Sequence, residues 1–278
     1  MIAADPTTLR GVLPPTYPLA VDNRAEAMDY RRPERELRAA TAAGTLGLHY
    51  QPRLCLATGE VMANEALVGS LRRKWSRSPP GVVIPAAERS GRTDQTGAWM
   101  LAEACREAAC WNTAHLFMNV SARRLQSGTL PIQLAAVLEQ SGLPPDRLEL
   151  VASSLVGSDA DTLLVLSALR DLGIGLALDD FGVGSASLSM LKRVPLTTVK
   201  LGRSLVRELP TSREGAVIVR ALVATGRAMR LTTVAEGIET EAQRAFLSGI
   251  GCDEGQGCLF SQPLPAGQLR PMLDAARA

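Results

Sequence analysis

Oxygen-bearing side chains stand at or near the ends of several apolar segments in this chain. The apolar run 175–178 stops at Asp179 and Asp180, and a glycine turn follows at once. Four further polar residues lie within other apolar segments or at their ends: Glu65, Asn119, Lys200 and Glu236. Carboxylate and amide oxygens are ligands that Mg²⁺, Mn²⁺ and Ca²⁺ prefer, and a chain with only two histidines is unsuited to a histidine-based metal centre. The pattern predicts a polar site built from oxygen ligands.

The order of predicted elements supplies a scaffold that can bring these residues together. Strands are predicted near residues 47–54, 61–67, 116–121, 148–153, 174–180, 197–202, 231–236 and 257–260. Helices are predicted near 33–43, 93–110, 130–141, 159–172, 213–229, 240–249 and 266–276. About eight strands with interleaved helices favour one α/β barrel. Active sites of such barrels form where the parallel strands end, so the polar residues are expected to meet there.

Length and composition narrow the function classes. The 278 residues, 46% of them hydrophobic, are enough to build the core of one barrel. A net charge of +2 and an aromatic content of 4% argue against a nucleic-acid partner. No apolar run reaches the roughly 20 residues of a membrane span, so no membrane partner is expected. Five cysteines, an odd number, and a start without a basic region or apolar segment predict a cytoplasmic location.

Two parts of the chain are expected to behave differently. Five prolines and the lack of a sustained apolar period predict that residues 1–33 form a partly disordered N-terminal extension. Residues 34–278 would form the barrel domain. The long connection 68–92 leaves the strand that carries Glu65, and loops of this length are more often functional than structural. Its basic run 72–77 could grip phosphate, although a solvated loop is the preferred interpretation.

An ordered series of motifs gives this chain a specific resemblance. The series comprises His49-Tyr50-Gln51-Pro52, Glu65-Ala66-Leu67, Asn119-Val120-Ser121-Ala122, Asp179-Asp180-Phe181-Gly182, Lys200, Ala235-Glu236-Gly237-Ile238-Glu239-Thr240 and Gly257-Cys258-Leu259-Phe260-Ser261-Gln262-Pro263-Leu264. In this order and with these gaps, the chain resembles the EAL domains. Members of that family hydrolyse the bacterial second messenger cyclic di-GMP or have decayed into its receptors. The resemblance implies a modified TIM-type (β/α)8 barrel with one antiparallel strand.

The resemblance also implies roles for individual residues. Metal ligands would be Glu65, Asn119 and Asp179, with Asp180 serving a second metal. The catalytic groups would be Glu236, as a general base or metal ligand, and Lys200, which would hold a water or a phosphate oxygen. Ligand-binding side chains would be Gln51, Asn119, Lys200, Gln256 and Gln262. Two cations held by carboxylates can activate a water and polarise a phosphodiester, which is the chemistry that this hydrolysis requires.

Several positions depart from the family pattern. Val151 stands in place of a metal-binding glutamate, and Ser154 in place of a second glutamate. Gly69 replaces an arginine expected at a ligand phosphate and precedes Ser70, and Gly202 replaces an aspartate. The loop after Phe181 is altered at Val183 and Ser185. We therefore expect an incomplete metal site in which Glu236 and Lys200 are remnants of a catalytic pair. No cofactor is expected, and Mg²⁺ or Mn²⁺ would bind weakly.

Two residues leave alternatives open. Glu149 could supply the missing ligand, but it lies two residues from Val151, roughly 7 Å deeper on the same strand face, which makes this the less favoured interpretation. Lys200 could form a salt bridge to Asp179 or Glu236 inside the barrel instead of holding a phosphate oxygen.

Three function classes follow, of which the first is favoured. It is a catalytically impaired EAL domain that acts as a regulatory module in cyclic di-GMP-linked signalling, through an unidentified protein partner and with weak or no nucleotide binding. The second is a receptor that binds cyclic di-GMP intact, and the third is a residual metal-dependent phosphodiesterase. The resemblance leaves a homodimer open.

Overall fold

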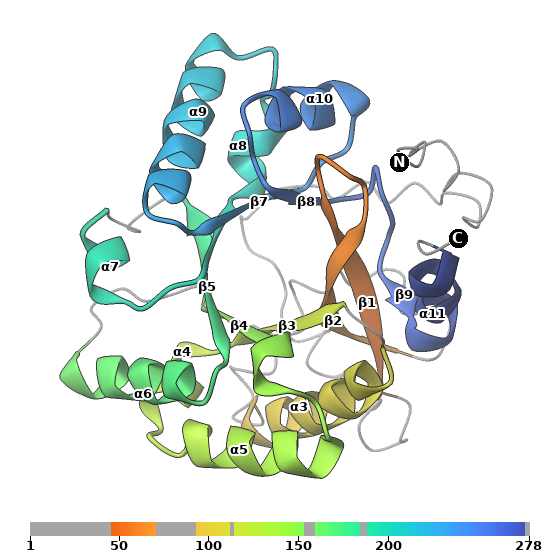
Figure 1. The fold of residues 1–278 in the computed structure, drawn as a ribbon, viewed down its shortest axis with the longest axis vertical. Coiled ribbons are helices and arrows are strands. Elements are labelled where there is room, and N and C mark those ends of the chain that lie inside the picture. Colours follow the sequence, from red (N-terminus) through yellow and green to blue (C-terminus); the bar gives the residue numbers. More distant parts are fainter. Residues whose placement is uncertain (1–45, 71–92, 112–113, 153–158, 184–187, 276–278) are drawn as a thin grey trace, which may run out of the picture.

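The fold is a closed barrel of eight strands that helices wrap on the outside (Figure 1). A computed structural model describes residues 46–70, 93–111, 114–152, 159–183 and 188–275. The strands are β1 (Leu46–Cys55), β2 (Val61–Ser70), β3 (His115–Val120), β4 (Leu148–Ala152), β5 (Gly175–Phe181), β6 (Thr198–Leu201), β7 (Thr232–Glu236), β8 (Glu254–Gln256) and β9 (Leu264–Pro265). Strands β2 to β8 pair in chain order, and β1 closes the ring between β8 and β2.

Strand β1 is antiparallel to both of its neighbours in the ring, whereas β2 to β8 are mutually parallel. Only residues 56–60 connect β1 to β2, and a parallel crossover needs a dozen residues or more. Gly59, at φ 77°, donates its backbone N–H to the Cys55 carbonyl at 2.8 Å and closes this turn. The expected modified (β/α)8 barrel with one antiparallel strand is confirmed.

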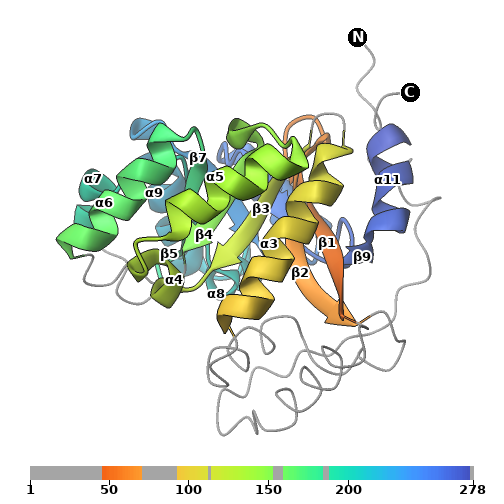
Figure 2. The ribbon, with the colours of Figure 1, turned by 90° about the horizontal axis from the view of Figure 1, so that it is seen from below.

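Helices cover the outside of the ring. They are α3 (Thr93–Ala109), α4 (Ala122–Gln126), α5 (Leu130–Ser141), α6 (Ala160–Asp171), α7 (Leu188–Arg193), α8 (Arg203–Arg207), α9 (Arg213–Ala228), α10 (Glu241–Gly249) and α11 (Ala266–Ala275). Helices α3, α5 and α6 form a row along one side, and α11 lies beside β1 and β9 (Figure 2). Within the described part of the chain, the helices are too short or too polar to cross a bilayer.

Local sequence sets the ends of several helices. The Asp159 carboxylate accepts a hydrogen bond from the Thr162 N–H at 2.8 Å and caps α6. Thr240 and Gln243 form a reciprocal capping box at the start of α10. Gly142, at φ 72°, ends α5 in the left-handed conformation. These signals explain why the sequence-predicted bounds of the three helices differ from the observed ones by at most one residue.

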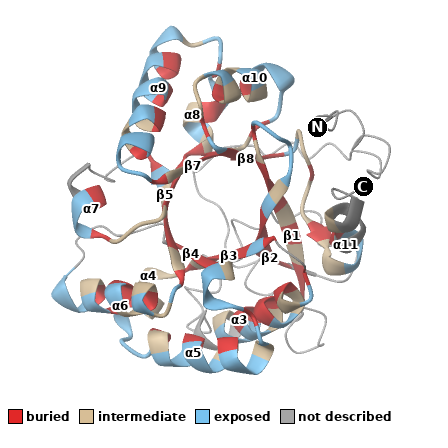
Figure 3. Ribbon diagram, in the orientation of Figure 1, coloured by how far each residue is buried: buried red, intermediate tan, exposed pale blue. Residues whose placement is uncertain are grey.

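Apolar side chains pack in two separate places. The larger core lies between the strands and the helices, and Figure 3 shows most of the strand ribbon as buried. The smaller core consists of Ala63, Phe117, Val151 and Ala177 inside the barrel, none of them more than 1% exposed. Successive side chains of a strand point to opposite faces, so one set fills the barrel and the other packs against the helices. We call the smaller core the inner apolar layer.

The predicted strand near 257–260 is wrong, because the eighth strand occupies 254–256. Phe260 and Ser261 both donate their backbone N–H to the Gly257 carbonyl, at 3.1 and 3.2 Å, so the chain turns there. A Cβ on Gly257 would lie 2.1 Å from the Ile238 carbonyl oxygen, and only glycine fits this close approach. Helices α4, α7 and α8, five or six residues long, were missed because they are too short to show a helical period.

Three sequence-based predictions fall outside the described residues. They concern the partly disordered extension 1–33, the helix 33–43 and the basic run 72–77.

Candidate functional site

Seven polar side chains gather on the inner side of the barrel, which we call the polar cluster. They are Gln51, Glu65, Asn119, Asp179, Lys200, Glu236 and Gln256, each from a different strand. Asn119 and Asp179 follow members of the inner apolar layer by two residues, so strand alternation points them inward, one step nearer the strand ends. The structure thus brings together most of the site residues that the sequence predicted.

Hydrogen bonds join one half of the cluster into a continuous chain. Glu65 accepts from the Asn119 amide at 2.8 Å through Oε1 and from the Gln256 amide at 2.6 Å through Oε2. The Gln256 amide also donates to Gln51 Oε1 at 2.9 Å, and the Gln51 amide donates to the Ser261 carbonyl at 2.9 Å. Each oxygen of the Glu65 carboxylate therefore has an amide donor from the protein.

The other half of the cluster centres on Lys200. Its side chain is 1% exposed, its Nζ is paired with the Glu236 carboxylate, and Asp179 Oδ1 lies 3.9 Å away. The ammonium also lies 4.9 Å from the centre of the Phe117 ring. Burial alone would lower the pKa of Lys200, but the carboxylates of Glu236, Glu65 and Asp179 outweigh it and raise the pKa above its ordinary value. The carboxylates around Lys200 thus favour its charged ammonium form.

The pKa of Glu236 lies above its ordinary value, whereas a carboxylate in an exposed ion pair usually has a lowered pKa. Burial raises it above its ordinary value, Lys200 opposes the rise, and the carboxylates of Asp179 and Glu65 add to it. Burial of the carboxyl is the main cause of the rise, and the neighbouring carboxylates add to it. Three carboxylates and one ammonium give the cluster a formal charge of −2 when all are ionised.

Asp180 differs from its neighbour Asp179. It has a left-handed backbone at φ 50° and is exposed. Its Oδ1 lies 2.7 Å from where a Cβ would stand on Gly202, next to Val183. An aspartate at position 202 would need this space, so the glycine accommodates the observed position of Asp180. Although the residue as a whole is exposed, partial burial of its carboxyl, and next the charge of Asp179, raise the pKa of Asp180.

Val151 of strand β4 points into the barrel at the position where the resemblance implies a carboxylate. Val151 is fully buried in the inner apolar layer, beside Asn119 and Ala177 in the strand register. It packs against apolar partners and has no atom that can bind a metal.

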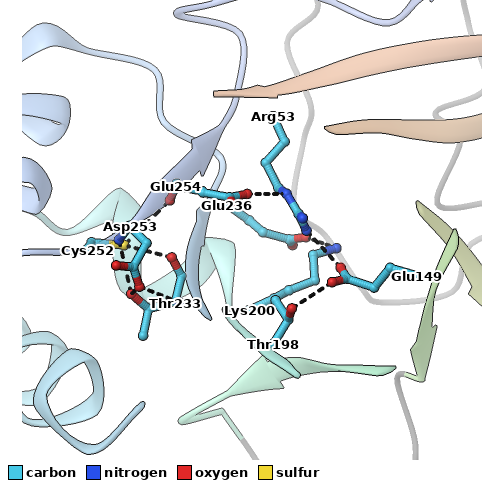
Figure 4. Close-up of polar contacts among 9 residues, drawn as sticks. All are labelled: Arg53, Glu149, Thr198, Lys200, Thr233, Glu236, Cys252, Asp253 and Glu254. Atoms are coloured by element: carbon cyan, nitrogen blue, oxygen red, sulfur yellow. Dashed lines mark hydrogen bonds and ion pairs between the residues drawn. The ribbon is translucent and has the colours of Figure 1, made fainter. Parts of the chain in front are cut away.

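Glu149, the alternative ligand, belongs to a second polar group inside the barrel, together with Arg53, Thr198 and Glu254 (Figure 4). It accepts from Arg53 Nη1 at 2.8 Å and from the Thr198 hydroxyl at 2.6 Å. Arg53 also forms an ion pair with Glu254 at 2.5 Å. We call Arg53, Glu149, Thr198 and Glu254 the Arg53 network. The suggestion that Glu149 replaces the missing ligand is not supported, because both of its oxygens serve this network.

Sequence reasoning missed two residues of the interior, Arg53 and Phe117. Arg53 is 4% exposed, and its guanidinium carbon lies 4.8 Å from the centre of the Phe117 ring, which also contacts Lys200. Phe117 thus lies between the Arg53 network and the polar cluster. The alternation of Arg53 with Gln51 in β1 was a usable signal, because it places both on the inward face.

The donor set of the described residues tests the expected metal site. No group of three or more His, Cys, Asp or Glu side chains in this part of the chain is arranged to hold a metal ion. Val151 offers only methyl groups, Glu65 accepts two amide hydrogen bonds, and Glu236 faces Lys200. As arranged, these residues do not fit the carboxylate-rich metal centre that the resemblance implies.

The remaining predicted positions lie at the edge of the site or outside the described residues. Gln262 is half-buried and follows Ser261, whose carbonyl accepts from Gln51. Gly69 lies in β2 opposite Gly47, without a side chain to offer. Ser154 and Ser185 fall outside the described residues.

The ring with one reversed strand and the polar cluster at its carboxyl-end face define a modified TIM barrel with an inward-facing polar site. The family model described as "EAL domain" matches residues 34–263. The chain belongs to the EAL domain family.

Known relatives support this assignment. The chain is 37% identical over 252 residues to the bifunctional diguanylate cyclase/cyclic di-GMP phosphodiesterase MucR of Pseudomonas aeruginosa, covering 88% of this chain and 37% of that protein. It is 38% identical over 256 residues to the cyclic di-GMP phosphodiesterase NbdA of the same organism, covering 88% of this chain and 32% of that protein. The chain therefore spans about a third of the length of these curated relatives.

A solved structure of the phosphodiesterase PaMucR in complex with c-di-GMP superimposes with a TM-score of 0.80. The two share 36% sequence identity, and the match covers 86% of this chain and 99% of that one.

Proposed function

We propose that this chain is a catalytically impaired EAL domain that acts as a regulatory module in cyclic di-GMP signalling. The observation that carries the proposal is Val151. It stands where the resemblance places a metal-binding glutamate, and its side chain is sealed in the inner apolar layer. Hydrolysis of a phosphodiester by metal-activated water needs a centre that lowers the pKa of that water. The loss of an anionic ligand lowers the affinity of such a centre for its metal ion.

Electrostatics favour weak nucleotide binding. Cyclic di-GMP carries two negative charges, and Lys200 is the single cation among three carboxylates in the polar cluster. At about 5 Å and an effective dielectric near 20, each pair of like charges costs about 3 kcal/mol. Gly69 supplies no charge to offset this repulsion. We expect a dissociation constant above about 10 μM or no binding, so that regulation would run through a protein partner, in the cytoplasm and as a monomer or homodimer.

The second candidate is a receptor that binds cyclic di-GMP intact. One observation favours it, namely the row of hydrogen bonds from Glu65 through Gln256 and Gln51 to the Ser261 carbonyl. These hydrogen bonds hold polar side chains in place inside the barrel, and PaMucR, a protein of similar fold and sequence, was solved in complex with c-di-GMP. A residual phosphodiesterase is the third candidate, with Mg²⁺ or Mn²⁺ bound weakly.

Two measurements separate the candidates. Conversion of cyclic di-GMP to the linear dinucleotide is followed with Mg²⁺ or Mn²⁺ at micromolar protein, and turnover of about 1 s⁻¹ or more would refute the proposal. Calorimetric titration with cyclic di-GMP, with and without Mg²⁺, tests binding. A submicromolar constant without metal would establish the receptor instead.

A further inference from the structure

His49 lies on the inward face of strand β1, at the carboxyl-end face of the barrel. Its neighbour Tyr50 is fully buried in the larger core outside the ring, and the Tyr50 hydroxyl donates to Glu107 of α3 at 2.5 Å. Successive side chains of a strand point to opposite faces, so His49 and Gln51 both point into the barrel. Since β1 is antiparallel to β2, His49 lies nearer the carboxyl end of β2 than Gln51 does. The barrel thus has an inward polar side chain that is not part of the polar cluster.

The register of β1 and β2 places His49 beside the position where the resemblance implies an arginine. His49 pairs with Leu67, and Gly47 pairs with Gly69. Val68 packs in the larger core, so Leu67 and Gly69 share the inward face with His49. His49 and position 69 are therefore diagonal neighbours, about 7–8 Å apart, a separation that ring side chains can bridge. A ligand group that an arginine at position 69 would hold is within reach of the His49 imidazole.

The imidazole of His49 is half-buried and has one nitrogen that the described residues leave unsatisfied. This nitrogen, Nδ1, is sealed from solvent and has no hydrogen-bond partner in the described part of the chain. Burial lowers the pKa of His49, so the ring is neutral near pH 7. A proton on Nδ1 would be buried without an acceptor, whereas Nε2, on the other edge of the ring, can donate to a ligand. The surroundings therefore favour a neutral ring with its proton on Nε2.

The place of His49 also separates it from the carboxylates of the polar cluster. Gln51 pairs with Glu65 in the same register, two residues further into the barrel. A phosphate at His49 would therefore lie roughly 7 Å nearer the carboxyl-end face than the level of Glu65, where repulsion is weaker. One neutral hydrogen bond is weaker than the charged, bidentate contact that an arginine makes to a phosphate. Such a contact favours nucleotide binding that is weak but not absent.

We propose that His49 is a phosphate-binding residue of this chain, and that it donates one hydrogen bond from Nε2 to a phosphate oxygen of cyclic di-GMP in place of the arginine missing at position 69. The inference rests on the proposed function, of which it specifies the weak-binding form. It assigns the phosphate contact to a neutral side chain at the carboxyl-end face, apart from Lys200 and the carboxylates.

The first test follows the histidines by NMR. The chain contains only two, His49 and His115, so their imidazole signals can be observed individually. His115 is exposed and begins β3, at the end of the barrel opposite to the carboxyl-end face, so it serves as the internal control. Histidine-labelled full chain is titrated in EDTA with cyclic di-GMP to millimolar concentration and, separately, with guanosine, which lacks a phosphate. We expect cyclic di-GMP to shift the His49 signals, guanosine to leave them in place, and His115 to respond to neither.

The second test measures affinity for cyclic di-GMP calorimetrically in EDTA. His49→Phe keeps a ring in this position and removes both nitrogens, and His115→Phe makes the same change at the opposite end of the barrel and also assigns the two sets of NMR signals. We expect His49→Phe to weaken binding about three- to tenfold, the range of one neutral hydrogen bond, and His115→Phe to bind like the wild type.

Three results would overturn the inference. The first is His49 signals that do not move at millimolar cyclic di-GMP, a measurement on the wild type that stands even where His49→Phe fails to fold. The second is equal affinity of His49→Phe and the wild type. The third is an equal shift of the His49 signals with guanosine, which would assign the contact to the base. None of these refutes the proposed function, which fails on a separate observation, hydrolysis of cyclic di-GMP by the wild type.

Discussion

Replacing Val151 by glutamate should make the stability of this protein depend on metal. The valine is fully buried, so its removal from the inner apolar layer costs about 1.5 kcal/mol. A carboxylate in its place, lacking a donor among Ala63, Phe117 and Ala177, costs about 2 kcal/mol more. A loss of about 3.5 kcal/mol corresponds to a fall in melting temperature of about 7–14 °C in EDTA.

Mn²⁺ should reverse most of this loss, because the new carboxylate adds a ligand to Glu65, Asn119 and Asp179. At 100 times the dissociation constant, a ligand specific to the folded state contributes about 2.7 kcal/mol, or about 5–11 °C. The assay is thermal unfolding in EDTA and across a Mn²⁺ series. Val151→Gln is the matched control, since it has the same length and no charge, and it should lose stability without regaining it. An equal response of both variants, or of the parent chain, would show that position 151 does not face the site.

Three further outcomes are expected. Arg53→Met leaves Glu149 and Glu254 buried without their cation and should lower the free energy of unfolding in urea by about 3–5 kcal/mol, whereas Arg106→Met on the surface should change little. Burial alone would raise the pKa of Glu149, but Arg53 and Thr198 outweigh this effect and lower the pKa. Ionised Glu149 therefore stabilises the fold above its ordinary pKa of 4.5, and this contribution is lost as the pH falls. The stability of Glu149→Gln should therefore vary less with pH below about 4.5, and an unchanged acid limb would contradict this sign. A chain that begins at Pro33 should melt within a few degrees of the full chain, and a large drop would mean that residues 1–33 pack on the barrel.

The sequence alone determined the succession of elements and the residues that end the strands. Strand alternation and helix capping act over two to four residues, so they can be read locally, as Asp159 and the Thr240 capping box show. The same alternation placed Glu149 below Val151, as observed. The reversed direction of β1 came from the resemblance to the EAL domains and not from periodicity, and residues 257–260 were misread because their apolar character hides a turn at Gly257.

Only the tertiary structure decided which charges meet. Arg53 and Glu149 are 96 residues apart, so no local pattern could pair them. The sequence left open whether Lys200 pairs with Asp179 or Glu236 or holds a phosphate oxygen, and the fold places its Nζ against Glu236. The barrel brings these side chains into its interior, where an unpaired charge is costly and buried carboxylates need donors. That requirement, acting on residues distant in sequence, separates the Arg53 network from the polar cluster and places Lys200 among the carboxylates at its centre.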